Sequence, residues 1–281
     1  MPIYDQGYRR YVARSPLHRA RFWPITREAL SLILAKRAFV FLLLASLAPF
    51  AFRVVQIYIV TRYPEIGRLL PVDGRLFGEF LNGQILLMVL ISVFGASGLI
   101  ANDLRTGAIL VYLSRPLTRR DYIAGKLGVP LALNLGVTLA PGLLLYLAGL
   151  LLAPEQYLKW SLAWIAPAIV AHAVAASLVV SLLTLAISSL SKSARVAGLG
   201  FVGVFFGLEV MRTVLQAGFN RNEAVLISLW GGLKALGVAF FGVEDYQLNV
   251  SWVWPLLVLS AASLVCLAVL RSRVRAVEIV T

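Results

Sequence analysis

Long apolar runs alternate with short polar segments along most of this chain. A helix needs about twenty largely apolar residues to cross the hydrocarbon core of a bilayer. Runs of that length cover residues 38–60, 83–101, 127–152, 162–190, 196–217 and 252–270. The pattern therefore predicts an all-α integral membrane protein with six transmembrane helices.

A further apolar stretch, residues 224–243, is nearly long enough for a seventh crossing but contains several glycines. Charge decides its assignment, because Lys and Arg concentrate in the cytoplasmic loops of membrane proteins. With six crossings, the basic residues before position 38, in segment 102–126 and after position 270 share one side. We therefore expect a multi-pass protein of the cell's inner (plasma) membrane with both termini in the cytoplasm. Segment 218–250 is then an external helical segment before the last span, interpreted as a re-entrant helical hairpin or a surface helix pair.

Composition excludes several classes of protein. With 60% hydrophobic and 14% charged residues, the chain is too apolar for a soluble domain of this length. The net charge of +13 fits anchoring beside anionic lipid, so no nucleic-acid partner is expected. Cys266 is the single cysteine and the two histidines lie far apart, so neither an intrachain disulfide nor a metal site is predicted.

The N-terminal residues 1–37 are rich in Arg and aromatic residues and contain no long apolar run. We interpret their first part as a cytoplasmic basic arm that rests on membrane lipid. Thr26 is a candidate N-cap for a helix that reaches Lys36 and mixes apolar with charged positions. This pattern is typical of an interfacial elbow helix along the inner leaflet, ahead of a six-span domain at residues 38–281.

Segment 102–126 interrupts the apolar pattern between the second and third spans. It must lie in water because hydrocarbon cannot solvate its cationic groups, which belong to Arg105, Arg115, Arg119, Arg120 and Lys126. Its apolar residues recur at roughly helical spacing and are Leu104, Ile109, Leu110, Leu113 and Leu117. We expect an amphipathic helix over residues 104–113 that ends before Pro116, and a second helix that starts near Thr118 and enters the membrane.

An ordered set of residues in this segment resembles the membrane subunits of the type-2 family of ATP-binding-cassette (ABC) transporters. After their second span, those subunits have an acidic residue four positions before a Gly-Thr pair, a Leu-rich turn, a small-x-Pro, one or two Arg and a Gly-Lys. This chain has the same order in Asp103, Gly107, Leu110, Leu113, Ser114, Pro116, Arg119, Arg120, Gly125 and Lys126. Ala108 stands where the family usually has Thr, and Asp103 where it usually has Glu.

The resemblance implies a membrane-spanning permease subunit of an ABC transporter, an exporter by family analogy, that pairs with a second permease subunit. ATP and Mg would be bound by a separate ABC ATPase subunit, while this chain would hold no cofactor and no catalytic site. Segment 102–126 would be the coupling insert that docks on the ATPase, helped by the elbow helix. The candidate ATPase-coupling residues are Asp103, Arg105, Gly107, Leu110, Leu113, Pro116, Arg119, Arg120 and Lys126.

Three charged residues within spans are candidates for the substrate pathway. Arg53 lies toward the outer end of the first span, where its side chain can also snorkel to water. Glu209 and Arg212, three positions apart in the fifth span, can form a structural ion pair or part of a substrate site. In the third span, Asn134 and Thr138 share one helix face that points either to a polar path or to another helix.

Two alternative functions stay open at the level of the sequence. Ser97 within a Gly-x-Ser-Gly run and His172 two spans later resemble the catalytic pair of rhomboid intramembrane serine proteases. Small residues and a single histidine also occur where membrane helices simply pack together. The second alternative is a non-transporting scaffold whose insert recruits a soluble partner.

Overall fold

The structure is a computed structural model that describes residues 22–63, 73–113, 117–152, 163–219, 222–243 and 251–274. Side chains at positions 110, 111, 113, 219 and 222 are outside this description, although their backbone lies in helices. The basic arm at residues 1–21, the predicted helix end at residues 114–116 and parts of segment 218–250 also lie outside the described residues.

The described residues form helices joined by short connections and contain no strand. Six helices are long and apolar enough to cross a membrane, as predicted. In chain order they are α2 with α3 (Arg37–Ala45, Ala48–Arg62), α5 with α6 (Gly74–Gly95, Gly98–Thr106), α8 (Arg119–Leu152), α11 (Ile165–Ser188), α12 (Ala194–Phe219) and α14 (Val253–Arg273).

Two of these spans are interrupted. The first breaks at Ser46 and Leu47, and Pro49 then occupies the first turn of α3, where it has no hydrogen bond to lose. The second breaks at Ala96 and Ser97, whose amides both donate to the carbonyl of Ser92 before α6 begins. Each interruption divides one predicted apolar run into two helical pieces.

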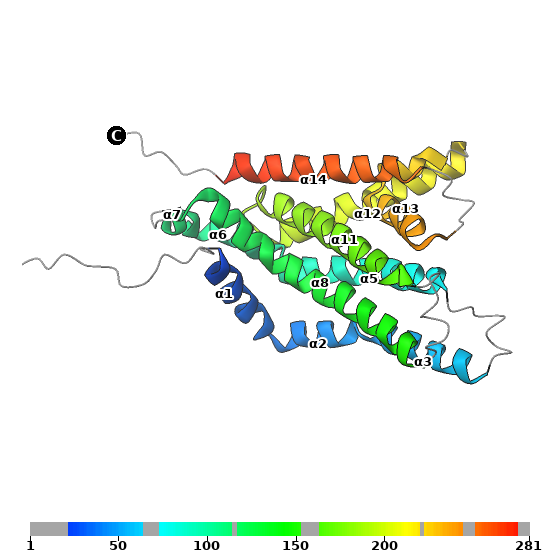
Figure 1. The fold of residues 1–281 in the computed structure, drawn as a ribbon. Helices are drawn as coiled ribbons and strands as arrows, with labels where there is room; N and C mark the ends of the chain where they lie inside the picture. Colours follow the sequence, from blue (N-terminus) through cyan, green and yellow to red (C-terminus); the bar gives the residue numbers. More distant parts are fainter. Residues whose placement is uncertain are drawn as a thin grey trace, which may run out of the picture.

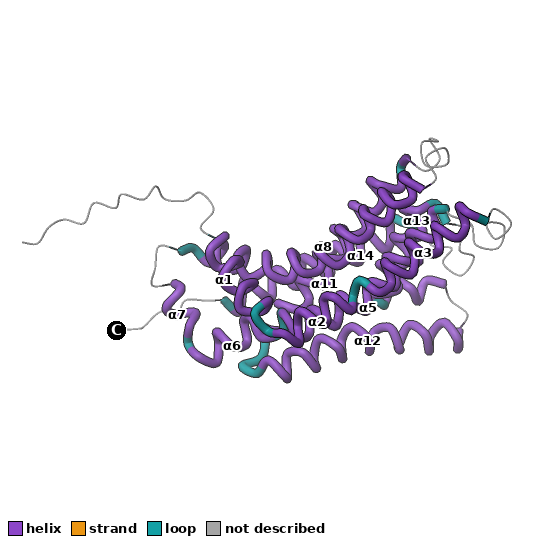
Figure 2. Tube along the Cα trace, turned by 90° about the horizontal axis from the view of Figure 1, so that it is seen from below, coloured by secondary structure: helices purple, strands orange, loops and turns teal. Residues whose placement is uncertain are grey.

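Helix α11 occupies the centre of the bundle and contacts α5, α8, α12, α14 and the short helix α13 (Leu229–Phe241) (Figures 1 and 2). About two thirds of its apolar stretch (67%) is buried, against 11% for the first span, which lies at the periphery. Within this core, the Asn134 side chain of α8 donates to Ser92 of α5 at 3.2 Å and to Ser181 of α11 at 3.1 Å. Asn134 therefore joins three spans and faces helices rather than a polar path.

The segment before the last span forms a 3-10 helix, η1 (Asn222–Ile227), and a short helix, α13 (Leu229–Phe241). Helix α13 is too short to cross a bilayer, which agrees with six crossings. It is buried among α5, α11 and α14, with Gly231, Gly232 and Gly237 inside the contact. Lys234 and Ala239 stay exposed, so α13 packs into the bundle with one side open, which fits the re-entrant interpretation better than a helix lying on the surface.

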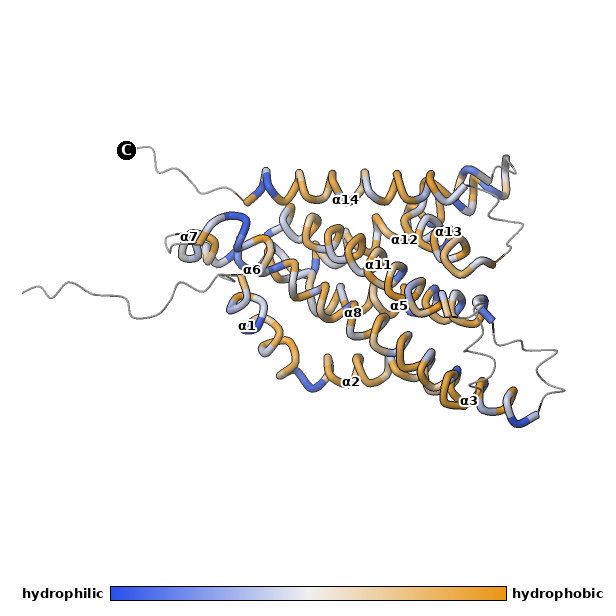
Figure 3. The backbone as a smooth tube through the Cα atoms, viewed as in Figure 1, coloured by the Kyte–Doolittle hydropathy of each residue, from blue (hydrophilic) through white to orange (hydrophobic). Residues whose placement is uncertain are grey.

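The two ends of the bundle are built from different elements. One end holds helix α1 (Trp23–Leu34), α6, helix α7 (Ala108–Leu113) and the last turn of α14 (Figure 1, left). Hydrophilic residues lie at both ends of the bundle, at this end around α6 and the end of α14, whereas the middle parts of the spans are largely hydrophobic (Figure 3). The opposite end holds α13 and the end of α3. The segment with the candidate coupling residues thus lies beside α1.

Candidate functional site

The segment between the second and third spans folds as two helices with a sharp turn between them. Helix α6 continues the second span to Thr106, Gly107 adopts a left-handed conformation with φ 70°, and α7 follows. The prediction of one helix over residues 104–113 is therefore wrong. A left-handed residue ends an α-helix, and glycine adopts that conformation without the steric cost of a side chain.

The helix predicted to start near Thr118 is confirmed as α8. The Thr118 hydroxyl and backbone amide both donate to Asp121 Oδ2, at 2.8 and 3.1 Å. The Asp121 amide donates back to the Thr118 hydroxyl at 3.2 Å. This reciprocal capping fixes the start of α8, and it leaves Arg119 and Arg120 exposed in the first turn.

Asp103 and Lys126, which both belong to the predicted coupling set, form a nearly buried ion pair. Lys126 Nζ lies 2.7 Å from Asp103 Oδ2, and the side chains are 6% and 14% exposed. The Tyr122 hydroxyl donates to the same carboxylate oxygen at 2.7 Å. The ammonium group also lies over the rings of Tyr112 and Tyr122, 5.5 and 5.7 Å from their centroids. The opposite charge, the Tyr122 hydrogen bond and the two aromatic faces together compensate the loss of hydration of both buried ions.

This ion pair ties the two ends of the segment together, because Asp103 lies on α6 and Lys126 on α8. The predicted set consequently divides into two parts. Asp103 and Lys126 are internal, whereas Arg105, Arg119 and Arg120 are exposed at the same end. The side chains of Leu110 and Leu113, and the whole of Pro116, lie outside the described residues.

Helix α1 is attached directly to the start of α8. The Thr26 hydroxyl donates to the carbonyl of Gly125 at 2.7 Å. The helix begins at Trp23 with Pro24 in its first turn, so the predicted capping role of Thr26 is wrong. A Cβ at Gly125 would lie 2.8 Å from Ile25 Cβ and 2.9 Å from the Phe22 carbonyl oxygen. Only glycine lets the two helices approach so closely. A Cβ at Gly128 would likewise lie too close to the side chain of Thr26.

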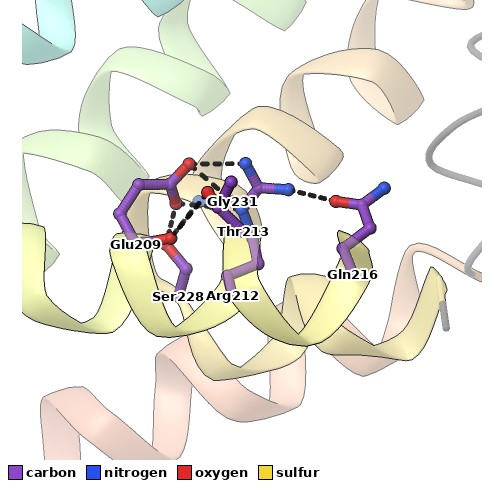
Figure 4. A network of polar contacts seen from close by, with 6 residues as sticks. All are labelled: Glu209, Arg212, Thr213, Gln216, Ser228 and Gly231. Atoms are coloured by element: carbon purple, nitrogen blue, oxygen red, sulfur yellow. Dashed lines mark hydrogen bonds and ion pairs between the residues drawn. The ribbon is translucent and has the colours of Figure 1, made fainter. Parts of the chain in front are cut away.

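The three charged residues proposed for a substrate pathway all have partners within the chain. Arg53 lies 3.2 Å from Glu79 of α5 and donates to Gln56 at 2.8 Å. Arg212 Nη2 lies 2.6 Å from Glu209, and Arg212 also donates to Gln216 at 2.6 Å (Figure 4). The Arg53–Glu79 contact joins α3 to α5, whereas the contacts of Arg212 with Glu209 and Gln216 lie within α12.

Glu209 also reaches the start of α13. The Ser228 hydroxyl donates to the Glu209 carboxylate and accepts a hydrogen bond from the Gly231 amide at 3.0 Å (Figure 4). Ser228 is the N-cap of α13, so one carboxylate joins α12 to α13. The geometry fits the structural ion pair, one of the two interpretations of Glu209 and Arg212.

Ser97 and His172 do not meet. The Ser97 hydroxyl donates to the carbonyl of Val93, and the Ser97 carbonyl accepts from Ser188 near the end of α11. His172 lies sixteen residues before Ser188 on that helix, about 24 Å away at 1.5 Å per residue. It packs edge-on against Phe241 of α13. A serine–histidine dyad is therefore excluded.

Sequence reasoning missed the residues that assemble this end of the bundle. Tyr112 and Tyr122 flank Lys126, and Thr26 with Gly125 joins α1 to α8. One signal was present, because Tyr122 precedes Lys126 by four positions and therefore shares its helix face. No sequence pattern shows that Asp103, on a different helix, faces the same point.

The chain matches a known family over most of its length. Residues 26–256 match a family described as "ABC-2 family transporter protein". The match covers α1, the insert, the first five spans and the start of the last. The comparison with curated proteins gives no match for this chain.

Proposed function

Because this chain belongs to the ABC-2 family of transporter membrane proteins, and is thus a permease subunit whose ATPase is a partner, we propose that segment 102–126 and α1 together receive the ATPase. The single observation that supports this proposal is a series of contacts that leads from the exposed arginines at the start of α8 to the helices that continue into the spans. Arg119 and Arg120 start α8, the Asp103–Lys126 pair ties α8 to α6, and Gly125 seats α1.

A force on this surface moves several spans together because buried contacts join them. Helices α6 and α8 continue directly into the second and third spans, and α1 continues through residues 35–36 into the first. ATP binding would close two ATPase subunits and displace α1, α6, α7 and α8 as one body. The spans of two permease subunits would then alternate between inward-open and outward-facing states. The direction of transport is export, by analogy with the family.

Charge supports a cytoplasmic position for this surface. The end of the bundle that carries it also carries Lys36, Arg37, Lys192 and Arg195 at the starts of spans, and Arg271 and Arg273 at the end of α14. Positive charge beside spans favours the cytoplasmic face. The buried α13 then lies at the external end, as a re-entrant helix before the last span.

The test uses charge reversal on the exposed part of the surface. The double variant Arg119→Glu and Arg120→Glu should lose at least tenfold in affinity for the ATPase, measured by co-purification and titration, because rim cations pair with acidic groups of a partner. The matched control, Arg271→Glu with Arg273→Glu, reverses two exposed charges at the same end outside the insert. Equal ATPase binding in the two double variants would contradict the proposal.

A second readout separates a transporter from a scaffold. A scaffold binds the ATPase without moving, whereas a permease should change the distance between spin labels on α8 and α12 when ATP binds. No change in that distance with the ATPase bound would favour the scaffold.

A further inference from the structure

The turn between α5 and α6 departs from α-helical bonding in the middle of the second span. The Ser97 amide donates to the carbonyl of Ser92, five residues back, at 3.0 Å, as in a π-type turn. The Ala96 amide donates to the same carbonyl at 2.9 Å. Turns of this kind bend helices, and they displace backbone groups from their usual partners. The displaced groups must therefore find other partners inside the bundle.

Two serine hydroxyls supply these partners. The Ser97 hydroxyl donates at 2.6 Å to the carbonyl of Val93, which the Ser97 amide would reach in a regular α-helix. The Ser188 hydroxyl comes from α11 and donates to the Ser97 carbonyl at 2.6 Å. It also accepts from the amides of Ile100 and Ala101, at 3.2 and 3.0 Å. Ser188 is fully buried, and these three bonds use the whole capacity of its hydroxyl.

Ser188 bonds to both groups of one helical pair. In a regular α-helix, the Ala101 amide donates directly to the Ser97 carbonyl. The Ser188 hydroxyl bonds to each of these groups and therefore competes with the direct bond. Helix α6 has no side-chain cap from its own N-cap residue, so its start is held by α11 instead. The turn consequently has two arrangements that satisfy its backbone, one bridged by Ser188 and one bonded directly.

Small residues surround the turn. A Cβ at Gly98 would lie 3.1 Å from the Cβ of Ala194, at the start of α12. A Cβ at Gly198 would lie 3.5 Å from the Ser97 hydroxyl. Close contact without long interlocking side chains lets α6 turn against α12 with little repacking. The Gly-x-Ser-Gly run of the sequence thus belongs to the packing of this turn.

The third span has a weak point at the same depth. A Cβ at Gly95 would lie 3.2 Å from Leu133 of α8, and further toward the insert Asp103 pairs with Lys126. The turn lies between Gly95 and Asp103, and Pro130 lies between Lys126 and Leu133. Pro130 is inside α8 and has no amide to donate to the carbonyl four residues back. Both spans that leave the insert are therefore weakened at one level.

We propose that the turn from Ser92 to Ala101 is a hinge and that Ser188 is its positioning residue. The insert, α6 and the first turns of α8 swing about this point, whereas α5 and α11 keep their places in the core. Ser188 stabilises the bent arrangement, and force on the insert favours the directly bonded one. This inference rests on the proposed function, because the ATPase supplies the force.

Distances between spin labels test the hinge in the full-length chain. In a Cys266→Ser background, one label is placed at Thr106→Cys, the end of α6, and the other at Leu190→Cys, beside the end of α11; both positions are exposed. A swing of about 20° moves the far end of α6, which is 9 residues long, by roughly 4–5 Å. A second pair, with Val265→Cys on α14 in place of position 190, detects motion in another direction.

Removing the two hydroxyls should favour the directly bonded turn. Ser97→Ala with Ser188→Ala should shift the distance distribution without ATPase, and it should reduce the shift on ATP binding by at least half. The matched control is Thr184→Val with Ser189→Ala, whose buried hydroxyls donate to carbonyls of their own helix. Identical distributions in the test and control variants would overturn the proposal. Ser188→Ala alone carries the same expectation if the double variant does not fold.

The part of α8 is tested by restoring an amide. Pro130→Ala should reduce the ATP-driven shift by at least half, whereas Pro141→Ala, at the other proline inside α8, should not. Equal shifts in these two variants would overturn the role of Pro130.

ATPase titration separates this inference from the proposed function. Failure of the unsubstituted chain to bind the ATPase refutes the coupling surface, while the distances without ATPase still test the hinge. Normal ATPase affinity with an ATP-driven change between α8 and α12, but none between α6 and α11 or α14, refutes the hinge and leaves the coupling surface standing.

Discussion

At the scale of single residues, the contact with the largest consequence is the one between Asp103 and Lys126. Ions removed from water lose several kcal/mol of hydration each, and a nearby opposite charge recovers this only with good geometry and further partners. Here the further partners are the Tyr122 hydroxyl and the faces of Tyr112 and Tyr122. The pair therefore holds α6 and α8 together inside the insert, while Arg119 and Arg120 provide the exposed charge of the insert.

Removing one member of the pair should destabilise the protein strongly. We expect Lys126→Met to lower the free energy of unfolding by about 3 kcal/mol, because Asp103 is left charged and without its cation. Adding Asp103→Asn should recover much of that loss. Thermal unfolding in detergent measures both effects, with Arg119→Gln as the exposed control. If the double variant is as unstable as the sum of the two single variants, the two groups do not interact.

Glu209 and Ser228 lead to a second prediction at this scale. Ser228→Ala removes the N-cap of α13 and the hydroxyl that Glu209 accepts from, so it should cost about 1 kcal/mol of stability. Thr213→Val is the control, since the Thr213 hydroxyl is exposed and bonds only within its own helix. Transport lost in Glu209→Gln with stability and assembly intact would instead assign Glu209 to the substrate pathway.

At the scale of elements, the contact between α1 and α8 depends on two glycines of α8, which have no side chain to keep the helices apart. Gly125 and Gly128 let α1 approach so closely that the Thr26 hydroxyl reaches a backbone carbonyl of α8. Such a close approach favours joint movement of the two helices, because backbone of α1 lies directly against the glycines of α8. The elbow helix and the insert are therefore one element in mechanical terms.

Gly125→Ala should separate these helices. Its methyl group would lie 2.9 Å from the Phe22 carbonyl oxygen, which is backbone and cannot turn aside. We expect a loss of about 1–3 kcal/mol in the free energy of unfolding, typical of overpacking, together with weaker ATPase binding. Gly136→Ala on the same helix is the matched control, because nothing lies within 4 Å of its new methyl group. Equal melting temperatures for the two variants would contradict a tight joint.

Gly107 allows a test of the turn between α6 and α7 without steric complications. No atom lies within 4 Å of a Cβ there, so a substitution acts through the left-handed backbone alone. Gly107→Val should cost about 1–2 kcal/mol, and Gly107→Asn clearly less, because asparagine tolerates this conformation. ATPase titration of both variants measures whether the turn also orients α7. An identical loss of stability in the two variants would show that the turn is not left-handed.

At the scale of the whole molecule, successive spans cross the membrane in opposite directions. Each charged residue at the end of a span therefore lies on one of the two faces of the protein. The face with α1 and the insert carries the cations at the starts of α2, α8 and α12 and at the end of α14. The opposite face carries the Arg53–Glu79 and Glu209–Arg212 pairs, with Arg75 also paired to Glu79, so acids there offset part of the positive charge. This asymmetry predicts the orientation of the protein.

Cysteine labelling tests that orientation. In a Cys266→Ser background, a membrane-impermeant maleimide should label Arg62→Cys in intact cells and Lys192→Cys only after permeabilisation, because the two exposed positions lie at opposite ends of their spans. Retained ATPase co-purification shows that each variant is assembled. Labelling of position 192 in intact cells would place the insert outside and remove the basis of the coupling proposal.

The sequence by itself determined the six spans, the start of α8 at Thr118 and the position of the insert, because hydropathy and capping depend on neighbouring residues only. Only the tertiary structure decided that Asp103 meets Lys126, that Thr26 bonds to α8 instead of capping α1, that α13 packs into the bundle, and that Ser97 and His172 stay apart. These outcomes depend on how each helix is rotated and tilted against the others. Apolar runs in a membrane protein show which segments are helical. Nearly all faces of such helices are apolar, however, so the pattern does not show which face packs against which neighbouring helix.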